Sequence, residues 1–508
     1  MKRFLTNVNI LLSRLSSLGG SNGQLHHARF GLPHELASLT GHSLDGTHLL
    51  LGRSPMGGIY RVSPSRKRPE LGHMMVVAPP RSGKSLLAAS QILTWPGSLI
   101  IVDIKGELYE YTAGFRATLG PVYVLDPRGL GNRYDPLGAI TEEDELYEAA
   151  QALLHDPREG DGRSFTEWGI LLEVLKWQAC LELNRKTGSR HSFLPFSRAL
   201  SKLGINPAAA AINAISPALA QELLDGEYEE EFDYRDNKFF ANSWQGSRAR
   251  MYPLQTENVV RCFNGSDFTG KDVIAGDKPA TVYLRIPERM LKAKAPLIRL
   301  VLESLTSEMF DTYDEQQGQG CRPVLMILDE AGTIGFQKLP EYAATAAGRG
   351  ISLWLALQDL SQLDNLYKAH NARTIRNSMG AKVFYQQDDP ETAKHISETL
   401  GYRSGYSHSE TLRDGEVASQ GRSETAVPVF TSREAMEQEL DDVLFTYKNL
   451  KPGRGKRIEP WRYPLLEKRR AMSPPPVREL PPVPDIDFPS APGRGGGFRF
   501  PIDPDDYN

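Results

Sequence analysis

The run from Ala78 to Ser85 has the residue types of a turn that binds phosphate. It reads Ala-Pro-Pro-Arg-Ser-Gly-Lys-Ser, with a short apolar run before it and a helical pattern of leucine and alanine after it. The backbone N–H groups that begin a helix are unpaired and, with the helix dipole, favour an anion. The residues predicted to hold the phosphates of ATP are Pro80, Arg81, Ser82, Gly83, Lys84 and Ser85.

Two side chains of this turn are expected to carry the chemistry. Lys84 would place its charge on the β- and γ-phosphates, and the Ser85 hydroxyl would bind Mg²⁺. The full motif has glycine five residues before Gly83, where this chain has Ala78. The motif is therefore a hypothesis, and an ordinary strand-to-helix turn is the alternative.

A second run ends in two carboxylates. Five apolar residues, 324–328, precede Asp329 and Glu330, which is typical of a central parallel strand that delivers acids to the carboxyl edge of a sheet. A phosphate-binding turn lies at that same edge. We expect Asp329 to hold Mg²⁺ through water and Glu330 to polarise the attacking water. A strand followed by a helix cap is the alternative, which the presence of Lys84 makes weaker.

The composition limits the class of protein. The 508 residues suffice for two to four domains, and 59 basic against 63 acidic residues leave no global basic field for nucleic acid. Cys180, Cys262 and Cys321 lie too far apart for a metal motif or a disulfide framework, which indicates a reducing cytoplasm. No run of 18 apolar residues is present, and the first 20 residues form either an amphipathic surface helix or a simple terminus.

Strand-like runs alternate with helical patterns over most of the chain. This alternation predicts an α/β fold with a parallel-rich sheet and right-handed crossovers. Residues 45–62 are expected to add a small β-layer. The further predicted strands are 98–103, 121–126, 280–286, 352–358, 381–385 and 442–447.

Changes in composition and in hydrophobic periodicity divide the chain into five parts. Residues 141–269 are dominated by helical patterns and are predicted to form an all-α insertion. The parts are a leader and linker (1–27), a first nucleotide-binding part (28–140), the all-α insertion (141–269), a second nucleotide-binding part (270–470) and a disordered Pro/Gly-rich tail (471–508).

Four segments have open interpretations. The acidic run 227–233 is a solvated loop or helix face, or a partner-binding surface. Residues 403–425, rich in serine, glycine and glutamate, predict a long mobile loop. The basic run 451–470, interleaved with aromatic residues, either tracks a nucleic-acid backbone or is a solvated terminal strand. The acidic end of the tail, 503–506, is a candidate docking tag.

Taken in order, several segments closely resemble the coupling-protein ATPases of bacterial conjugation and type IV secretion. The resemblance covers about residues 28–465, and the joint set is far more specific than any one motif. The segments are 28–30, 49–52, 78–85, 95–98, 102–107, 134–137, 328–332, 348–350 and 358–362.

The resemblance implies a RecA-like motor, interrupted by an all-α domain, that works as a ring of six at the cytoplasmic face of the inner membrane. Members of the family pass a single DNA strand bound to its relaxase, or an effector protein, to a secretion channel using ATP and Mg²⁺. Lys84 and Ser85 match the family's phosphate-binding residues. Asp329 and Glu330 match its Mg²⁺-and-water pair, and Gln358 matches the amide that senses the γ-phosphate.

Arg349 lies where the family is thought to offer an arginine finger to a neighbouring subunit. Such a guanidinium stabilises the charge of the phosphoryl group as it is transferred. The alternative is a helix C-terminal cation beside Gly350.

One departure from the family concerns the start of the chain. Members usually begin with transmembrane helices, and this sequence has none, so contact with the membrane is expected to be peripheral or through a partner. A DNA translocase unconnected to secretion, and a nucleotide-gated scaffold without steady turnover, are the alternative functions.

Overall fold

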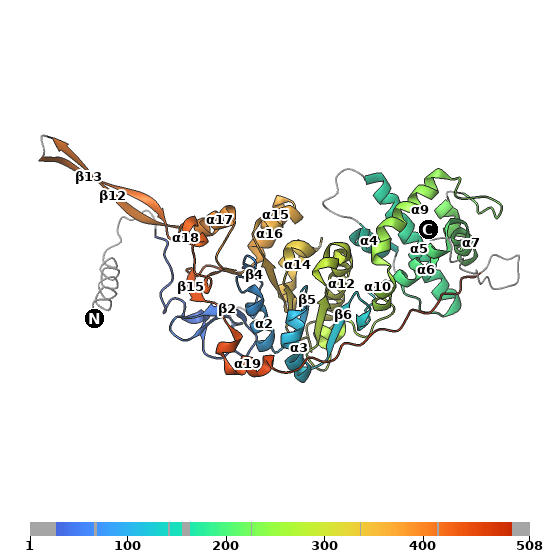
Figure 1. The fold of residues 1–508 in the computed structure, drawn as a ribbon, viewed down its shortest axis with the longest axis horizontal. Coiled ribbons are helices and arrows are strands. Elements are labelled where there is room, and N and C mark those ends of the chain that lie inside the picture. The colour runs from blue at the N-terminus through green and yellow to red at the C-terminus, as the bar shows by residue number, and fades with distance from the viewer. Residues whose placement is uncertain are drawn as a thin grey trace.

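The computed structural model describes residues 27–65, 69–140, 143–154, 163–224, 226–335, 337–413 and 416–489, and a 13-stranded sheet forms the body of this part of the chain (Figure 1). In spatial order the strands are β1 (Thr40–Gly41), β3 (Ile59–Val62), β2 (Leu49–Arg53), β15 (Gly453–Lys456), β14 (Asp442–Tyr447), β11 (Ala381–Phe384), β4 (Met74–Val77), β10 (Ile351–Leu357), β9 (Val324–Leu328), β5 (Ser98–Asp103), β8 (Thr281–Arg285), β6 (Val122–Asp126) and β7 (Leu130–Gly131).

The centre of this sheet is parallel. From β11 through β4, β10, β9, β5 and β8 to β6, each neighbouring pair is parallel, whereas β14 and β7 pair antiparallel at the two sides. The central strands therefore all end at one edge, here called the carboxyl edge. The predicted parallel-rich α/β sheet is confirmed.

Helices cover both faces of the sheet. Along β4, Met74 and Val76 lie in one hydrophobic core and Met75 and Val77 in the other, as alternation along a strand buried on both faces requires. The helices of the sheet body are α2 (Lys84–Thr94), α3 (Glu107–Leu119), α12 (Glu288–Glu315), α13 (Ala331–Ile334), α14 (Leu339–Thr345), α15 (Ser361–Leu366), α16 (Ala369–Ser378), α17 (Pro390–Leu400), α18 (Ser432–Met436) and α19 (Pro464–Arg470), with 3₁₀ turns η2 (Ala37–Leu39), η4 (Ala346–Arg349) and η5 (Pro460–Arg462).

A group of helices between β7 and β8, the helical insert, forms one end of the molecule (Figure 1). Among the described residues of this segment there is no strand. The long helix α5 packs against α4, α6, α7, α8 and α9. The elements of the helical insert are α4 (Glu143–Leu154), α5 (Arg163–Thr187), α6 (Phe193–Leu203), α7 (Ile205–Ile215), α8 (Pro217–Leu224), α9 (Lys238–Met251), η3 (Tyr252–Leu254) and α10 (Glu257–Cys262).

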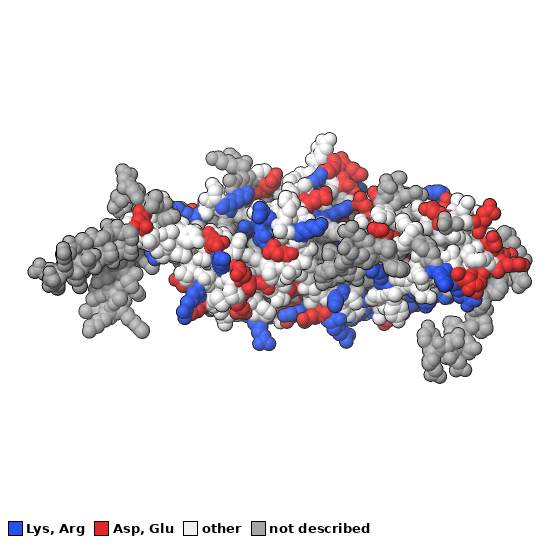
Figure 2. Space-filling view, turned by 90° about the horizontal axis from the view of Figure 1, so that it is seen from above, with Lys and Arg blue, Asp and Glu red and all other residues white. Residues whose placement is uncertain are grey.

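The helical insert ends before α11 (Gly270–Ala275), and it contains the acidic run 227–233. Helix α11 packs on α12 and so belongs to the sheet body. The acidic run connects α8 to α9, and Glu227, Glu229, Glu230 and Glu231 are exposed in it. On the face seen in Figure 2, basic and acidic side chains are interspersed over the sheet body.

The predicted mobile loop at 403–425 is wrong. These residues form an antiparallel hairpin of β12 (Tyr402–Arg413) and β13 (Glu416–Pro428), which projects at the end opposite the helical insert (Figure 1). The segment has few apolar residues, so the alternation that signals a half-buried strand is missing. Backbone pairing between the two strands runs along the length of the hairpin.

The structure also differs from the predicted disordered tail. Residues 471–489, here called the strap, run extended from α19 along the sheet body to the helical insert (Figure 1). The Gly131 N–H donates to the Arg478 carbonyl at 2.7 Å, and the Leu480 N–H donates to the Gly129 carbonyl at 2.8 Å. Further along, the Phe488 ring lies 5.3 Å from that of Phe196 in α6.

Composition misled this prediction because a proline-rich chain is extended before it binds and loses little entropy on docking. The predicted docking tag at 503–506 lies outside the described residues, as does the predicted surface helix in residues 1–20. In the part of the chain that is described, no helix is both long and apolar enough to cross a membrane.

Candidate nucleotide-binding site

The turn between β4 and α2 has the backbone of an anion cradle. The turn residues Arg81 and Gly83 have positive φ values of 66° and 100°, and the Ser82 hydroxyl closes the turn on the Pro79 carbonyl at 2.7 Å. A positive φ is costly for arginine, and such strain concentrates at ligand sites. Helix α2 begins at Lys84, and the first N–H groups of a helix have no partner within it.

Three of the predicted catalytic side chains, Lys84, Glu330 and Gln358, form a cluster around the Glu330 carboxylate at the carboxyl edge. The Lys84 ammonium lies 3.2 Å from Oε2 of Glu330, and the Gln358 amide donates to Oε1 of the same carboxylate at 3.0 Å. The contact arises because β4, β10 and β9 are neighbours, so the residues that follow them share one edge. The Lys84 and Glu330 side chains are 13% and 17% exposed, which keeps the pair reachable from solvent.

Asp329 lies beside this pair with an oxygen that nothing satisfies. Its Oδ1 atom is buried and has no hydrogen-bond partner among the described residues. Burial raises the pKa of Asp329 to about 7, and the carboxylates of Asp103 and Glu330 add to this while Lys84 opposes it. A buried carboxylate without a partner is costly unless a cation binds it. Asp329 and the Ser85 hydroxyl thus have the hard oxygen atoms that suit Mg²⁺.

The acids that end two other strands have structural roles. Asp103 accepts from the backbone N–H groups of Gly106 and Tyr109, both at 2.8 Å, and so caps α3. The Asp126 carboxylate pairs with Arg128.

Arg349 does not join the cluster of its own chain. It lies just before β10, at the edge opposite the one where Gln358 follows that strand. Its guanidinium donates to the Asp314 carboxylate, from Nε at 3.0 and 3.2 Å and from Nη2 at 2.7 Å, and it lies 4.5 Å from the Phe310 ring. The side chain is 29% exposed.

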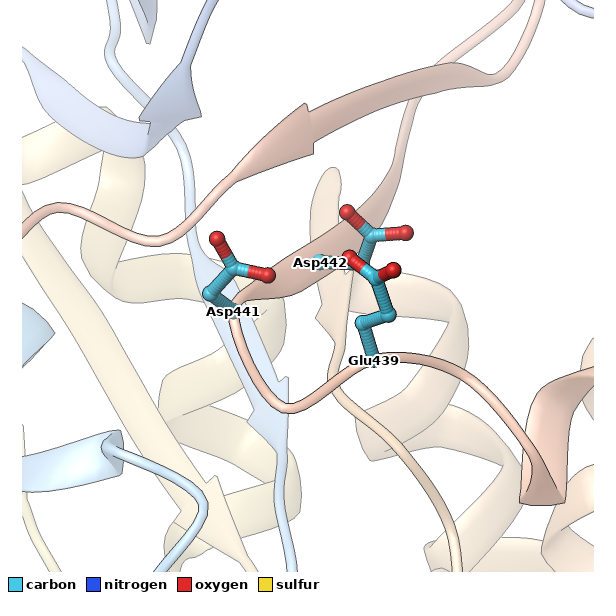
Figure 3. Close-up of side chains that lie close together, drawn as sticks. All are labelled: Glu439, Asp441 and Asp442. Atoms are coloured by element: carbon cyan, nitrogen blue, oxygen red, sulfur yellow. The ribbon is translucent and has the colours of Figure 1, made fainter.

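The basic run 451–470 is largely neutralised by carboxylates of the same chain. The Lys456 ammonium is bonded to Glu439, Asp441 and Asp442, which cluster as Figure 3 shows. Three acids this close would suit a metal ion, but Lys456 already supplies the cation. The other paired cations are Arg454 with Asp442, Arg457 and Arg462 with Glu459, Arg469 with Asp45, and Arg470 with Glu467.

This pairing favours a structural interpretation of the basic run over a track for nucleic acid. One member of it, Arg457, lies against Gly83 of the phosphate-binding turn. The sequence places Arg457 only within the basic run 451–470, because no local motif connects this residue to the phosphate-binding turn.

Two family models match the chain. The model described as "Type IV secretory system Conjugative DNA transfer" matches residues 50–163, and "TraM recognition site of TraD and TraG" matches residues 323–439. The two matches include the phosphate-binding turn and the paired acids respectively.

Individual relatives agree with the family models. The chain is 26% identical over 355 residues to Protein VirD4 of Rhizobium radiobacter, covering 65% of this chain and 48% of that protein. It is 27% identical over 373 residues to Conjugal transfer protein TraG of Escherichia coli, covering 65% and 55%. The chain therefore spans about half the length of the curated relatives it matches.

Solved structures share the fold. The bacterial conjugative coupling protein TrwB superposes with a TM-score of 0.63 at 15% identity, over 87% of this chain and 95% of that one. The same plasmid coupling protein in complex with ADP and Mg²⁺ gives a TM-score of 0.61, over 87% and 96%. At this identity the likeness shows the fold, a RecA-like P-loop fold.

Proposed function

Because the chain belongs to the coupling-protein family of type IV secretion systems, we propose that it is an ATP-hydrolysing motor that recruits a cargo and drives it into a secretion channel. The proposed cargo is a single DNA strand bound to its relaxase, or an effector protein. The observation that carries the proposal is the cluster of Lys84, Glu330 and Gln358 beside the unsatisfied oxygen of Asp329.

The cluster suits attack of water on the γ-phosphate. Glu330 takes a proton from the water molecule while the oxygen of that water bonds to the γ-phosphorus. The bond between the γ-phosphorus and the bridging oxygen breaks, and ADP leaves with that oxygen. Lys84 turns from Glu330 toward the β- and γ-phosphates, which frees Oε2 for the proton. Gln358 holds Oε1 and so fixes the orientation of the carboxylate. Ser85 and Asp329 would hold Mg²⁺, which supplies positive charge to the phosphate oxygens when bound.

Hydrolysis is proposed to require a ring of six chains. Arg349 faces away from its own turn, so it would act on the nucleotide of a neighbouring chain. In the single chain its guanidinium is held by Asp314, which keeps it oriented on the surface. The ring would work at the cytoplasmic face of the inner membrane, with peripheral contact or through a partner.

The test is ATP hydrolysis over a range of protein concentrations, with and without single-stranded DNA. A ring-forming motor is expected to show turnover per chain that rises with protein concentration and rises again with DNA. Binding of ATP without turnover at any concentration would instead indicate a nucleotide-gated scaffold.

The role of Arg349 has its own test. Arg349→Ala should lose turnover, and mixing it with Lys84→Ala chains should restore part of it, because a mixed ring contains sites with an intact turn and an intact neighbouring arginine. No recovery in rings of normal size would leave Arg349 as a cation that stabilises the end of its helix.

A further inference from the structure

Arg457 reaches the phosphate-binding turn from the far end of the chain. Strand β15 runs antiparallel to β14, and β14 antiparallel to β11, so β15 ends at the carboxyl edge. Arg457 follows it directly. Its Cδ and Nη1 atoms each lie 3.3 Å from the point that a Cβ atom on Gly83 would occupy.

The guanidinium is fixed on one side and open on the other. Its Nε and Nη2 atoms donate to Oε1 of Glu459 at 3.1 and 3.0 Å, and its backbone N–H donates to the Asp441 carbonyl at 2.7 Å. Within the described part of the chain, Nη1 has no acceptor. The side chain is 22% exposed, so this free donor is accessible beside the turn.

The sheet order says which part of a nucleotide this donor would meet. Glu330, which acts at the γ-phosphate, follows β9, on one side of β4. Arg457 comes from β15, on the other side of β4. A nucleotide whose γ-phosphate lies toward Glu330 therefore has its remaining phosphates and its ribose nearer to Arg457.

We propose that Arg457 is a nucleotide-binding residue of the same chain, which donates from Nη1 to the phosphates that ADP retains. This inference rests on the proposed ATPase function and adds to it a contact that persists after hydrolysis. Glu459 positions the guanidinium, and Gly83 leaves the space that its close approach needs.

The test measures ADP affinity of the full chain by titration calorimetry, together with the kinetics of ATP hydrolysis. Arg457→Gln should weaken ADP binding about tenfold, as expected for the loss of one charge-assisted hydrogen bond to a phosphate. KM for ATP should rise by a similar factor while kcat stays near the wild-type value, because the contact is the same before and after transfer.

Arg462→Gln is the matched control. Arg462 also pairs with Glu459, yet its side chain is 52% exposed and it supplies none of the atoms nearest to the Cβ position of Gly83. The Arg462→Gln variant should bind ADP with the same affinity as the wild type. Arg457→Lys retains the stem and the charge, and it should recover part of the lost affinity, which also covers the case in which Arg457→Gln folds poorly.

The outcomes separate this inference from the proposed function. Equal ADP affinity in wild type and Arg457→Gln, an equal loss in Arg457→Gln and Arg462→Gln, or a fall in kcat with unchanged affinity would each overturn it and leave the ATPase assignment standing. A folded wild-type chain that binds no ADP would overturn both.

Discussion

Two of the lysine–glutamate pairs in the described part of the chain lie in very different surroundings. In the helical insert, Lys176 and Glu173 are fully buried, with 2.8 Å between Nζ and Oε1. Glu173 also accepts from the hydroxyls of Ser197 at 2.5 Å and Ser247 at 2.6 Å, and Lys176 lies 4.5 Å from the Trp244 ring. The insert thus satisfies its buried charges internally.

The pair of Lys84 and Glu330 at the carboxyl edge, in contrast, lies beside a buried oxygen whose hydrogen-bonding capacity is not satisfied. Lys84 and Glu330 are partly exposed and 3.2 Å apart, and the neighbouring Asp329 has a buried oxygen without a partner. Buried charges that are fully hydrogen-bonded fix the packing of a core, whereas unfilled bonding capacity marks a place for a ligand.

Removal of Glu173 is expected to have the largest effect of the substitutions that test this comparison. Glu173→Ala leaves the Lys176 ammonium buried with Ser201 as its one remaining hydrogen-bond partner among the described residues, so the free energy of unfolding should fall by about 3–5 kcal/mol. Urea unfolding followed by tryptophan fluorescence measures this. ADP affinity of the folded fraction should stay unchanged, and a lower affinity with unchanged stability would contradict the distinction.

Lys84 should behave in the opposite way. Lys84→Ala should lower ATP turnover on the order of 100-fold, because one positioned cation at the transferred phosphate is lost. Its thermal midpoint should match the wild type. Lys278→Ala is the control, since Lys278 is an exposed lysine just before β8, at the opposite edge of the sheet. A similar loss in both variants would remove the special role of Lys84.

The strap connects the two regions, and its anchor is testable. Leu480 is 7% exposed, and Leu480→Ala should favour detachment of the strap by about 2 kcal/mol through lost burial. Cleavage of the strap under limited proteolysis should then be about 30-fold faster. Leu465→Ala, at a leucine that is 41% exposed in α19, should leave the cleavage rate unchanged.

Asp135 lies in the segment between β7 of the sheet body and α4 of the helical insert. Its substitution is expected to have the smallest effect, a change in how the free energy of unfolding depends on pH. Burial raises the pKa of Asp135 to about 6, against hydrogen bonds from Ser192 and the Leu137 N–H that lower it. The unfolded chain releases this proton near pH 4, so stability falls as the pH rises from about 4 to about 6 and is then level.

Asp135→Asn removes this titration. Between pH 5 and pH 8 the wild type should lose about 1 kcal/mol of unfolding free energy relative to the variant. Urea unfolding of both proteins at the two pH values measures the difference. A constant difference between them would mean that the folded and unfolded pKa values of Asp135 are the same.

The elements that carry the site were predictable because their signals are local. An apolar run followed by two acids predicts β9 and the position of Glu330, and the turn before α2 predicts Lys84. The two side chains are 246 residues apart, yet they could be placed together because parallel strands end at a common edge.

The features that were missed depend on contacts that composition does not encode. The hairpin β12–β13 is polar, although Asp414-Gly415 between its strands is a hairpin signal that the sequence does contain. The strap is ordered by docking at Leu480 and Phe488. Arg457 reaches Gly83 only through the order of β15, β14, β11 and β4 in the sheet.

The most direct measurement is ATP binding and ATP hydrolysis by Glu330→Gln beside the wild type. Glutamine keeps the shape of Glu330 but cannot take the proton from water, so turnover should fall by about 100-fold or more while ATP affinity stays near the wild-type value. Wild-type turnover by Glu330→Gln would contradict the assignment of this cluster as the site of hydrolysis.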